Sequence, residues 1–321
     1  MDASTPSGGS PLVIVNPEAS RLADPRRRAR IVEAVLAAVE ARTGRAPVVH
    51  DTTADAAADA VDAASDAPLI AVIGGDGTIR EAATALAGRS VPLAIVPAGT
   101  GNAFAAALGI PRRTEPAIRL IATGRPGPVD LGMATWGPPA LDAGGGGGGP
   151  AGSKAFVVAC GLGFDARVMA GASGELKRRL GFLAYVVVAA REAARIRPVT
   201  FRIEADGEVH DVRGLVVLVA NSGQLIPGVV GPRHPIDPTD GLLDVIVVTA
   251  TGVPDGLLGA AESLLAGGAP PHHRPRSMRL QARCVRVTSD PPEPVEVDGD
   301  AHEAGWLEAR ALPAAVTILR P

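Results

Sequence analysis

Residues 69–81, LIAVIGGDGTIRE, decide how this sequence is interpreted. The stretch opens with the apolar run Leu69 to Ile73, which predicts a buried β-strand. The strand pattern ends at a turn of three glycines, Asp76 and Thr78, and a helical pattern follows. Glycines let a ligand approach the backbone, and a helix N-terminus presents unpaired N–H groups, so this turn suits a phosphate. Asp76 would repel a phosphate unless Mg²⁺ bridged the two, and the lysine of a P-loop is missing.

A strand–helix alternation surrounds this turn. Apolar strand patterns at 11–16, 46–51, 69–74 and 92–97 are separated by helical spacing. Such alternation predicts an α/β domain with a parallel, Rossmann-like sheet over residues 11–125, preceded by a disordered tail at 1–10. In open parallel sheets, ligands bind beyond the carboxyl ends of the strands, which is where the glycine turn falls.

The pattern of secondary-structure signals changes after residue 125. Strand-like runs with turn residues between them predict a β-rich sandwich over 126–321. One helical pattern, at 175–195, and a glycine-rich flexible insert at 143–152 interrupt this domain. Whether the final residues return to the first domain is left open.

The composition excludes some classes of function. The net charge is −3 and only 2% of the residues are aromatic, so we expect no nucleic-acid partner. Two cysteines are too few for a disulfide framework and fit a reducing compartment. The apolar runs fall short of the roughly 20 residues that span a bilayer. We therefore expect a cytoplasmic protein without a transmembrane segment, attached at most to a membrane surface.

A second glycine turn strengthens the phosphate interpretation. The segment VPAGTGNAFAAALGIP (96–111) again places glycines, Thr100 and Asn102 between a strand and a helix. A single turn would equally suit a plain strand-to-helix connection with Asp76 as its cap. Two such turns at neighbouring strand ends favour a nucleotide site.

These motifs, in this order, resemble the diacylglycerol kinase catalytic-domain family, which includes bacterial lipid kinases and sphingosine kinases and is distantly related to NAD kinases. The resemblance runs from Leu12 to Leu319 through VNPEAS, HDTTADA, GGDGTIREAATAL, PAGTGNAFAAALGIP, VDLG, ACGLGFDARV, VANSGQLIPGV, PIDPTDGLLDV and EVDGD. It implies an NAD kinase/diacylglycerol kinase-like fold. It also implies an ATP- and Mg²⁺-dependent transfer of phosphate to a lipid hydroxyl at the membrane surface, most readily that of diacylglycerol.

The resemblance also assigns residues. It places the following in the ATP region: Asn16, Thr52, Gly75, Asp76, Gly77, Thr78, Thr100 and Asn102. Asp76 and Asp130 would belong to the Mg²⁺–water network that holds ATP. A structural Mg²⁺ would be bound by the Asp240 side chain and the carbonyls of Asp237 and Leu242, where a metal-free Asp-Gly turn is the alternative. A homodimer is left open.

Three positions depart from the family pattern. Ser20 stands where glycine is usual, Ala103 where aspartate is common, and Asp300 where glutamate is usual. Ala103 removes one carboxylate from the metal network, whereas Asp300 keeps the charge and shortens its reach.

The segment VEVDGDAHE supplies candidates for the proton acceptor. On a strand with a glycine kink, Asp298 and Asp300 would share a face, and one carboxylate would raise the pKa of the other. Asp298 is then the candidate general base for the lipid hydroxyl, with Asp76 as its competitor and an ordinary acidic turn as the alternative. Two other functions remain open: an NAD kinase, and a lipid-binding module without catalysis.

Overall fold

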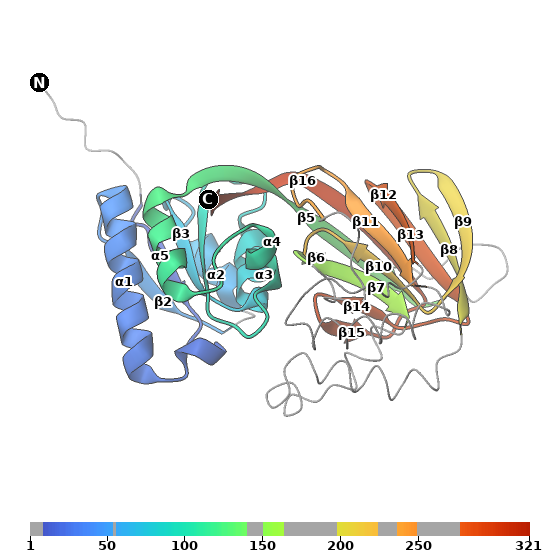
Figure 1. Ribbon diagram of the computed structural model, residues 1–321, viewed down its shortest axis with the longest axis horizontal. Coiled ribbons are helices and arrows are strands. Elements are labelled where there is room, and N and C mark those ends of the chain that lie inside the picture. The colour runs from blue at the N-terminus through green and yellow to red at the C-terminus, as the bar shows by residue number, and fades with distance from the viewer. Residues whose placement is uncertain (1–8, 54–55, 140–149, 164–197, 224–235, 249–276) are drawn as a thin grey trace, which may run out of the picture. The chain divides into compact units, whose positions relative to one another are not determined.

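The computed structural model describes residues 9–53, 56–139, 150–163, 198–223, 236–248 and 277–321. The chain divides into two compact units, one formed by Met1–Asp130 with Ala314–Pro321 and the other by Leu131–Pro313 (Figure 1). The division falls five residues after the expected boundary at 125, and the C-terminal residues return to the first unit. The expected helix at 175–195 and most of the insert at 143–152 lie outside the described residues.

The first unit alternates strands and helices as expected. Its elements are β1 (Leu12–Val15), η1 (Ser20–Leu22), α1 (Pro25–Thr43), β2 (Val48–Asp51), α2 (Ala57–Ala63), β3 (Ile70–Gly74), α3 (Asp76–Ala85), β4 (Leu93–Pro97), α4 (Ala103–Ala107) and α5 (Thr114–Thr123). The strands are parallel in the order β2-β1-β3-β4. The end of β16 (Trp306–Arg320) pairs in parallel with β4 through Ile318 and Leu93.

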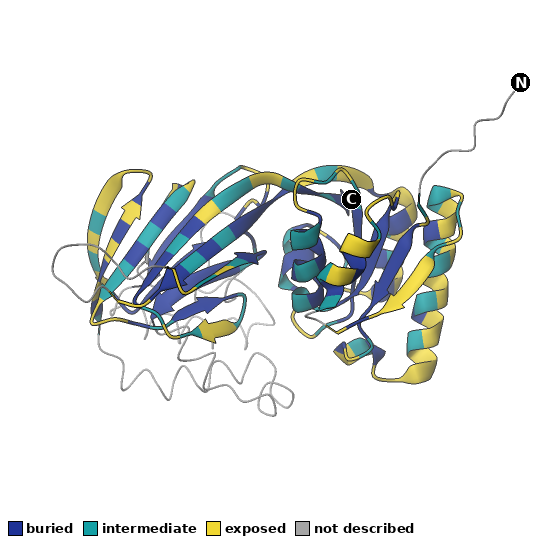
Figure 2. Ribbon diagram, turned by 180° about the vertical axis from the view of Figure 1, so that it is seen from behind, coloured by how far each residue is buried: buried dark blue, intermediate teal, exposed yellow. Residues whose placement is uncertain are grey.

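The helices cover both faces of this sheet (Figure 1). Buried Val35 and Val39 of α1 and Ile121 of α5 pack on one face, against a cluster that includes Val13 and Ile73. The strands β1, β3 and β4 are buried along their whole length, whereas the edge strand β2 is exposed (Figure 2). Burial on both faces explains why these strands read as continuous apolar runs in the sequence.

Local signals fix where α1 begins and ends. The Asp24 carboxylate accepts a hydrogen bond from the Arg27 N–H at 2.7 Å, and Pro25 occupies the first helical position. Gly44 ends the helix with φ +69°, a conformation that glycine adopts without steric cost. Both signals follow the usual asymmetry of helix ends.

The second unit is a sandwich of antiparallel sheets, as the sequence predicts. Its strands are β5 (Arg125–Gly137, which starts in the first unit), β6 (Gly152–Phe156), β7 (Ala159–Gly163), β8 (Val199–Ala205), β9 (Glu208–Gly214), β10 (Val216–Ala220), β11 (Leu243–Val248), β12 (Ser277–Ala282), β13 (Cys284–Asp290), β14 (Val295–Val297), β15 (Asp300–His302) and the first part of β16. One layer contains β16-β13-β8-β9, with β5 and β6 attached, and the other has the order β12-β11-β10-β7-β14-β15.

The core of this unit lies between the two layers. Phe201 and Val287 from one layer and Leu162, Val217 and Val245 from the other belong to the same buried cluster. Along β8, buried and exposed residues alternate, as expected for a strand with one face toward a core. No helix within the described ranges is both long and apolar enough to cross a membrane.

Candidate functional site

The carboxyl ends of the parallel strands bring the predicted phosphate residues to one edge of the first sheet. The backbone ladder continues one residue past three strands. Asn16 N–H donates to the Ile73 carbonyl at 3.0 Å, Thr52 N–H to the Val15 carbonyl at 2.8 Å, and Ala98 N–H to the Gly74 carbonyl at 2.8 Å. Asn16, Thr52 and the two glycine turns therefore lie on adjacent strand ends.

The two glycine turns touch each other through their backbones. A Cβ atom built on Gly99 would lie 2.6 Å from the Cα of Gly75, so there is no room for a side chain at Gly99. Asn102 closes the second turn, since its Oδ1 accepts from the Gly99 N–H at 3.0 Å and its Nδ2 donates to the Gly99 carbonyl at 2.7 Å. Asn102 has φ +52°, which asparagine tolerates better than most residues.

Asp76 connects the two turns. It is the first residue of α3, where the helix dipole favours a carboxylate. Its Oδ1 accepts a hydrogen bond from the Phe104 N–H at 3.2 Å, so it satisfies a backbone donor in the first turn of α4. Its Oδ2 faces the second turn, 2.9 Å from where a Cβ on Gly101 would stand. The cap considered in the sequence therefore exists, but it serves the neighbouring helix.

Two threonines complete this edge of the sheet. Thr78 is buried, and its Oγ1 accepts a hydrogen bond from the Asn16 Nδ2 at 2.9 Å, which ties the β1 end to α3. Thr52 is 8% exposed, yet its Oγ1 has no hydrogen-bond partner among the residues that the structure describes. A buried hydroxyl without a partner is costly and is suited to an external oxygen ligand such as a phosphate. The residues present therefore fit a bound phosphate.

Ser20 lies beside the second turn and forms hydrogen bonds with it. The Ser20 hydroxyl accepts from the Thr100 hydroxyl at 3.3 Å and lies 3.4 Å from the Ala98 carbonyl. The Arg21 N–H also donates to the Ala98 carbonyl, at 3.0 Å. The serine that departs from the family pattern thus contributes hydrogen bonds to the turn.

Asp130 has a structural partner that the sequence did not predict. It is 3% exposed on β5, and its Oδ1 accepts a hydrogen bond from the Ala314 N–H at 2.6 Å. Ala314 has φ +49°, an uncommon conformation for a residue other than glycine. The carboxylate therefore holds β16 where the chain re-enters the first unit.

The segment around Asp298 is a hairpin, and the prediction of one strand with a glycine kink was wrong. Strands β14 and β15 pair with Val297 opposite Asp300. Asp298 and Gly299 between them have φ +45° and φ +96°, as a two-residue hairpin turn requires. The rule that alternate residues share a face does not apply across such a turn. Asp298 and Asp300 consequently have separate partners.

The Asp298 carboxylate binds the turn between β6 and β7. Its Oδ2 accepts from the Val157 N–H at 2.8 Å, and its Oδ1 from the N–H groups of Val158 and Ala159, each at 3.0 Å. Both carboxylate oxygens of Asp298 are therefore occupied by backbone N–H groups of this turn. This geometry suits a positioning role for Asp298, and its assignment as the general base stays a prediction.

Asn221 and Ser222, which follow β10, hold the same turn, and the sequence did not single out either residue. They are fully buried, and the Ser222 Oγ and Asn221 Nδ2 donate to the Val157 carbonyl at 2.6 and 3.2 Å. Their signal in the sequence was the polar pair that ends the apolar run LVVLVANS.

Asp300 and His302 lie on β15, near the partly exposed Lys154. The Asp300 Oδ2 is 2.7 Å from the Lys154 Nζ. His302 stacks on Trp136 with ring centroids 4.1 Å apart. Burial lowers the pKa of His302 below its ordinary value of 6.5, with opposing contributions from Asp300 and Lys154. The neutral imidazole is therefore favoured, a feature that sequence reasoning missed.

Glu296 is one of the few buried carboxylates of the described residues. It accepts a hydrogen bond from the Gly299 N–H within the hairpin. Burial, followed by the nearby Glu296 and Asp298 carboxylates, raises the pKa of the Cys160 thiol well above its ordinary value. Cys160 is thus an unreactive residue of the core.

The loop proposed to hold a structural metal is closed by its own side chains. The Asp237 carboxylate accepts from the Thr239 N–H at 3.0 Å, and the Asp240 Oδ1 from the Leu242 N–H at 2.9 Å. The Asp240 Oδ2 accepts from Gln281 at 3.2 Å. Across the described ranges, no group of three or more His, Cys, Asp or Glu side chains is placed to hold a metal. The predicted ligand set has one carboxylate and two backbone carbonyls, so the metal stays a prediction.

Two family models match the chain, and together they account for both units. The model described as "Diacylglycerol kinase catalytic domain" matches residues 10–134, and "YegS C-terminal NAD kinase beta sandwich-like domain" matches residues 157–320. The first match includes both glycine turns, and the second includes the Asp298 hairpin.

Similar proteins include several named lipid kinases. A "Probable lipid kinase YegS-like" of Pseudomonas aeruginosa is 32% identical over 81% of this chain and 78% of that protein. The protein of the same name from Pseudomonas putida is 30% identical, over 77% of this chain and 75% of that protein. An uncharacterized protein of Synechocystis is 29% identical over 81% of this chain, which spans only 56% of that longer protein.

Solved structures share the whole fold. A crystal structure of a diacylglycerol kinase from Bacillus anthracis superposes with a TM-score of 0.66 at 21% identity, covering 99% of this chain and 98% of that one. Another structure from the same strain has a TM-score of 0.73 at 23% identity, covering 100% of this chain and 98% of that one. At these identities the likeness supports the fold alone. By its matches to both domain models and to the Pseudomonas relatives, the chain belongs to the family of YegS-like lipid kinases with a diacylglycerol kinase catalytic domain.

Proposed function

We propose that this protein is a lipid kinase that transfers the γ-phosphoryl group of ATP to a lipid hydroxyl. The observation that carries the proposal is the contact between Gly75 and Gly99, where the Cα of one leaves no room for a Cβ on the other. Two backbone turns this close, each followed by a helix, present several N–H groups to one anion. The Thr52 hydroxyl at the end of β2, on the same edge of the sheet, has no hydrogen-bond partner among the described residues and is a further candidate phosphate contact.

Each residue of the first unit has a distinct task in this proposal. Gly77 allows the phosphates to approach the backbone, and Thr100 adds a hydroxyl at the second turn. Gly75 provides the Cα against which Gly99 packs, so it keeps the two turns close together. Asn16, Thr78 and Asn102 keep the turns in place through the hydrogen bonds described above. Such residues act by preorganisation, which is the main contribution of a protein to phosphoryl transfer.

Asp76 is the proposed ligand of Mg²⁺ at this site. Mg²⁺ takes one or two protein carboxylates and completes its shell with phosphate oxygens and water, and it neutralises charge on the transferred group. Asp76 suits that pattern because its carboxylate lies between the two turns and is fixed by the Phe104 N–H. Asp130 stays a candidate for the same network, although its Oδ1 is engaged by Ala314.

The reaction needs a group that accepts the proton of the lipid hydroxyl. The hydroxyl oxygen forms its bond to the γ-phosphorus, the bond between that phosphorus and the β,γ-bridging oxygen breaks, and ADP leaves. Asp298 and Asp300 remain the candidates for this proton acceptor in the second unit, and Asp76 is the competing candidate in the first. The hydrogen bonds of Asp298 favour a role in positioning the hairpin that carries Asp300.

Diacylglycerol is the proposed acceptor, with phosphatidic acid as the product, and we place the enzyme in the cytoplasm at the membrane surface. The names of the relatives support a lipid as the acceptor, and the name of the first domain model supports diacylglycerol in particular. The test is incubation with γ-labelled ATP and Mg²⁺ and a panel of lipid alcohols in mixed micelles, with NAD in a parallel reaction. Label in phosphatidic acid supports the proposal. Label in another lipid would replace the acceptor, and label in NADP would replace the function. Lipid binding without any label transfer would indicate a non-catalytic module.

A further inference from the structure

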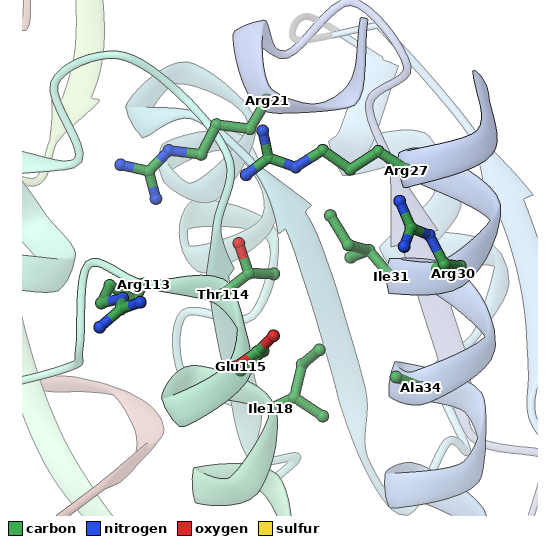
Figure 3. A pocket seen from close by; sticks show the side chains of 9 residues that line it. All are labelled: Arg21, Arg27, Arg30, Ile31, Ala34, Arg113, Thr114, Glu115 and Ile118. Atoms are coloured by element: carbon green, nitrogen blue, oxygen red, sulfur yellow. The ribbon is translucent and has the colours of Figure 1, made fainter. Parts of the chain in front are cut away.

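A hollow in the first unit, of about 640 Å³, lies between the first turns of α1 and α5. Four arginines line it. Arg21 comes from η1, Arg27 and Arg30 from α1, and Arg113 from the residue before α5. Figure 3 shows Arg21 and Arg27 above the space between the two helices, Arg30 on the α1 side and Arg113 on the opposite side, with Ala34 and Ile118 farther along the helices. The volume is within the range of small-molecule sites.

The charge of this hollow is unusual for this chain. One carboxylate, that of Glu115, lines it beside the four arginines, which gives the lining a formal charge of +3 in a chain of net charge −3. Within the described parts of the chain, the guanidinium groups of Arg27, Arg30 and Arg113 have no hydrogen-bond or ion-pair partner. Other arginines do meet carboxylates, namely Arg80, Arg89, Arg202, Arg279, Arg286 and Arg310.

Clustered positive charges repel each other, so an arrangement of this kind is stabilised by an anion. The geometry favours an anion with several oxygens. Arg21 is held in place because its Nη1 donates to the Arg112 carbonyl. Buried Thr114 begins the ten-residue helix α5, whose N-terminus receives no side-chain cap from Arg113. Guanidinium forks match phosphate oxygens in pairs, and an uncapped helix N-terminus adds N–H donors of the same sign.

We propose that this hollow is a second anion site that binds the phosphate group of a ligand. Its lining shares no residue with the phosphate edge formed by Asn16, Thr52 and the two glycine turns. The apolar side chains of Ala34 and Ile118 suit the organic part of a phosphate ester. That ester is either a small soluble molecule or the headgroup of an anionic phospholipid, which share this chemistry. The site does not depend on the proposed kinase activity.

Binding of inorganic pyrophosphate, measured by calorimetry without Mg²⁺ and nucleotide, tests the soluble form. The pocket variant is Arg27→Gln/Arg30→Gln. The matched control is Arg26→Gln/Arg28→Gln, which removes the same charge from the same helix outside the lining. Glutamine is a good helix former, so both variants should fold. We expect the pocket variant to bind about tenfold more weakly or worse, since two charge-assisted hydrogen bonds are lost, and the control to match the parent protein.

Co-sedimentation with phosphatidylglycerol vesicles, against phosphatidylcholine vesicles, tests the lipid form in the same three proteins. Loss of vesicle binding in the pocket variant alone assigns the phosphate to a lipid headgroup, and loss of pyrophosphate binding alone assigns it to a soluble ligand. Either result supports the site. Equal binding by the pocket variant and the control in both assays would overturn it, as would a complete absence of binding. Neither assay measures phosphoryl transfer, so failure here leaves the proposed function untouched.

Discussion

Gly99→Ala should disable the nucleotide site while Gly75→Ala should affect it much less. The new Cβ at Gly99 would lie 2.6 Å from the Cα of Gly75 and 3.1 Å from the Asn102 Oδ1. Non-bonded carbons prefer a separation of about 3.5–4.0 Å, so the turns must move apart by roughly 1 Å. At Gly75, which has φ −94°, the corresponding Cβ would be 3.4 Å from the Cα of Gly99, an ordinary contact.

The size of the effect follows from that displacement. Misplacement of reacting groups by about 1 Å can lower turnover by about 10²-fold, and forcing a methyl group into a packed site costs about 1–3 kcal/mol of stability. We therefore expect Gly99→Ala to lower kcat/KM by about two orders of magnitude and the melting temperature by a few degrees. Gly75→Ala adds the same methyl group from the opposite side and should stay within about tenfold of the parent.

The assay is ATP-dependent lipid phosphorylation together with nucleotide binding, with circular dichroism as the control for folding. The two variants must be compared at a temperature at which both are folded. Equal activity in Gly99→Ala and the parent protein would refute the contact as the basis of the site. Equal damage in both variants would show that glycine itself, and not the close approach, is required.

Three further results are expected. Asp76→Asn keeps an oxygen for the Phe104 N–H, so it should fold, but it should lose nucleotide affinity and roughly 10²-fold or more in turnover. Asp298→Asn should bind Mg-ATP nearly normally and lose phosphoryl transfer. The reverse pattern would exchange the roles of the two residues. Asp240→Ala should lower the melting temperature and reduce the stabilisation gained from added Mg²⁺, and an identical Mg²⁺ response in both proteins would exclude a metal in that loop. Burial lowers the pKa of His302, so the unfolded chain binds the proton more readily than the folded chain. The contribution of His302 to the free energy of unfolding should therefore be full above pH 6.5 and fall below it. His302→Phe should flatten this decline between about pH 7.5 and 5, and an unchanged dependence of stability on pH would contradict the assignment.

Much of the first unit could be predicted because local patterns determine it. Buried parallel strands produce continuous apolar runs in the sequence, and the glycines of each turn indicate where a strand ends. The helix α3 already begins at Asp76, inside the glycine turn, with the extended Gly75 as its N-cap residue. Boundaries of this kind depend on backbone angles, which the residue pattern does not specify.

The errors around Asp298 have a different cause. An alternating polar pattern suits either one strand or a hairpin, and an Asp-Gly pair is a strong hairpin signal that was interpreted as a kink. The partners of Asp298 come from residues 157–159, about 140 positions away in the chain. Lys154 reaches Asp300 over a similar separation. Contacts between distant segments follow from the strand order, so the pattern of one segment cannot reveal them.

The most direct test of the central claim is a crystal structure with Mg²⁺ and a non-hydrolysable ATP analogue. The account predicts the phosphates of the analogue against the backbone of residues 75–78 and 99–102, with the Thr52 hydroxyl within hydrogen-bond distance of a phosphate oxygen and Mg²⁺ on the Asp76 carboxylate. Phosphates bound elsewhere, for example among Arg21, Arg27 and Arg30, with the two glycine turns free of ligand, would contradict it.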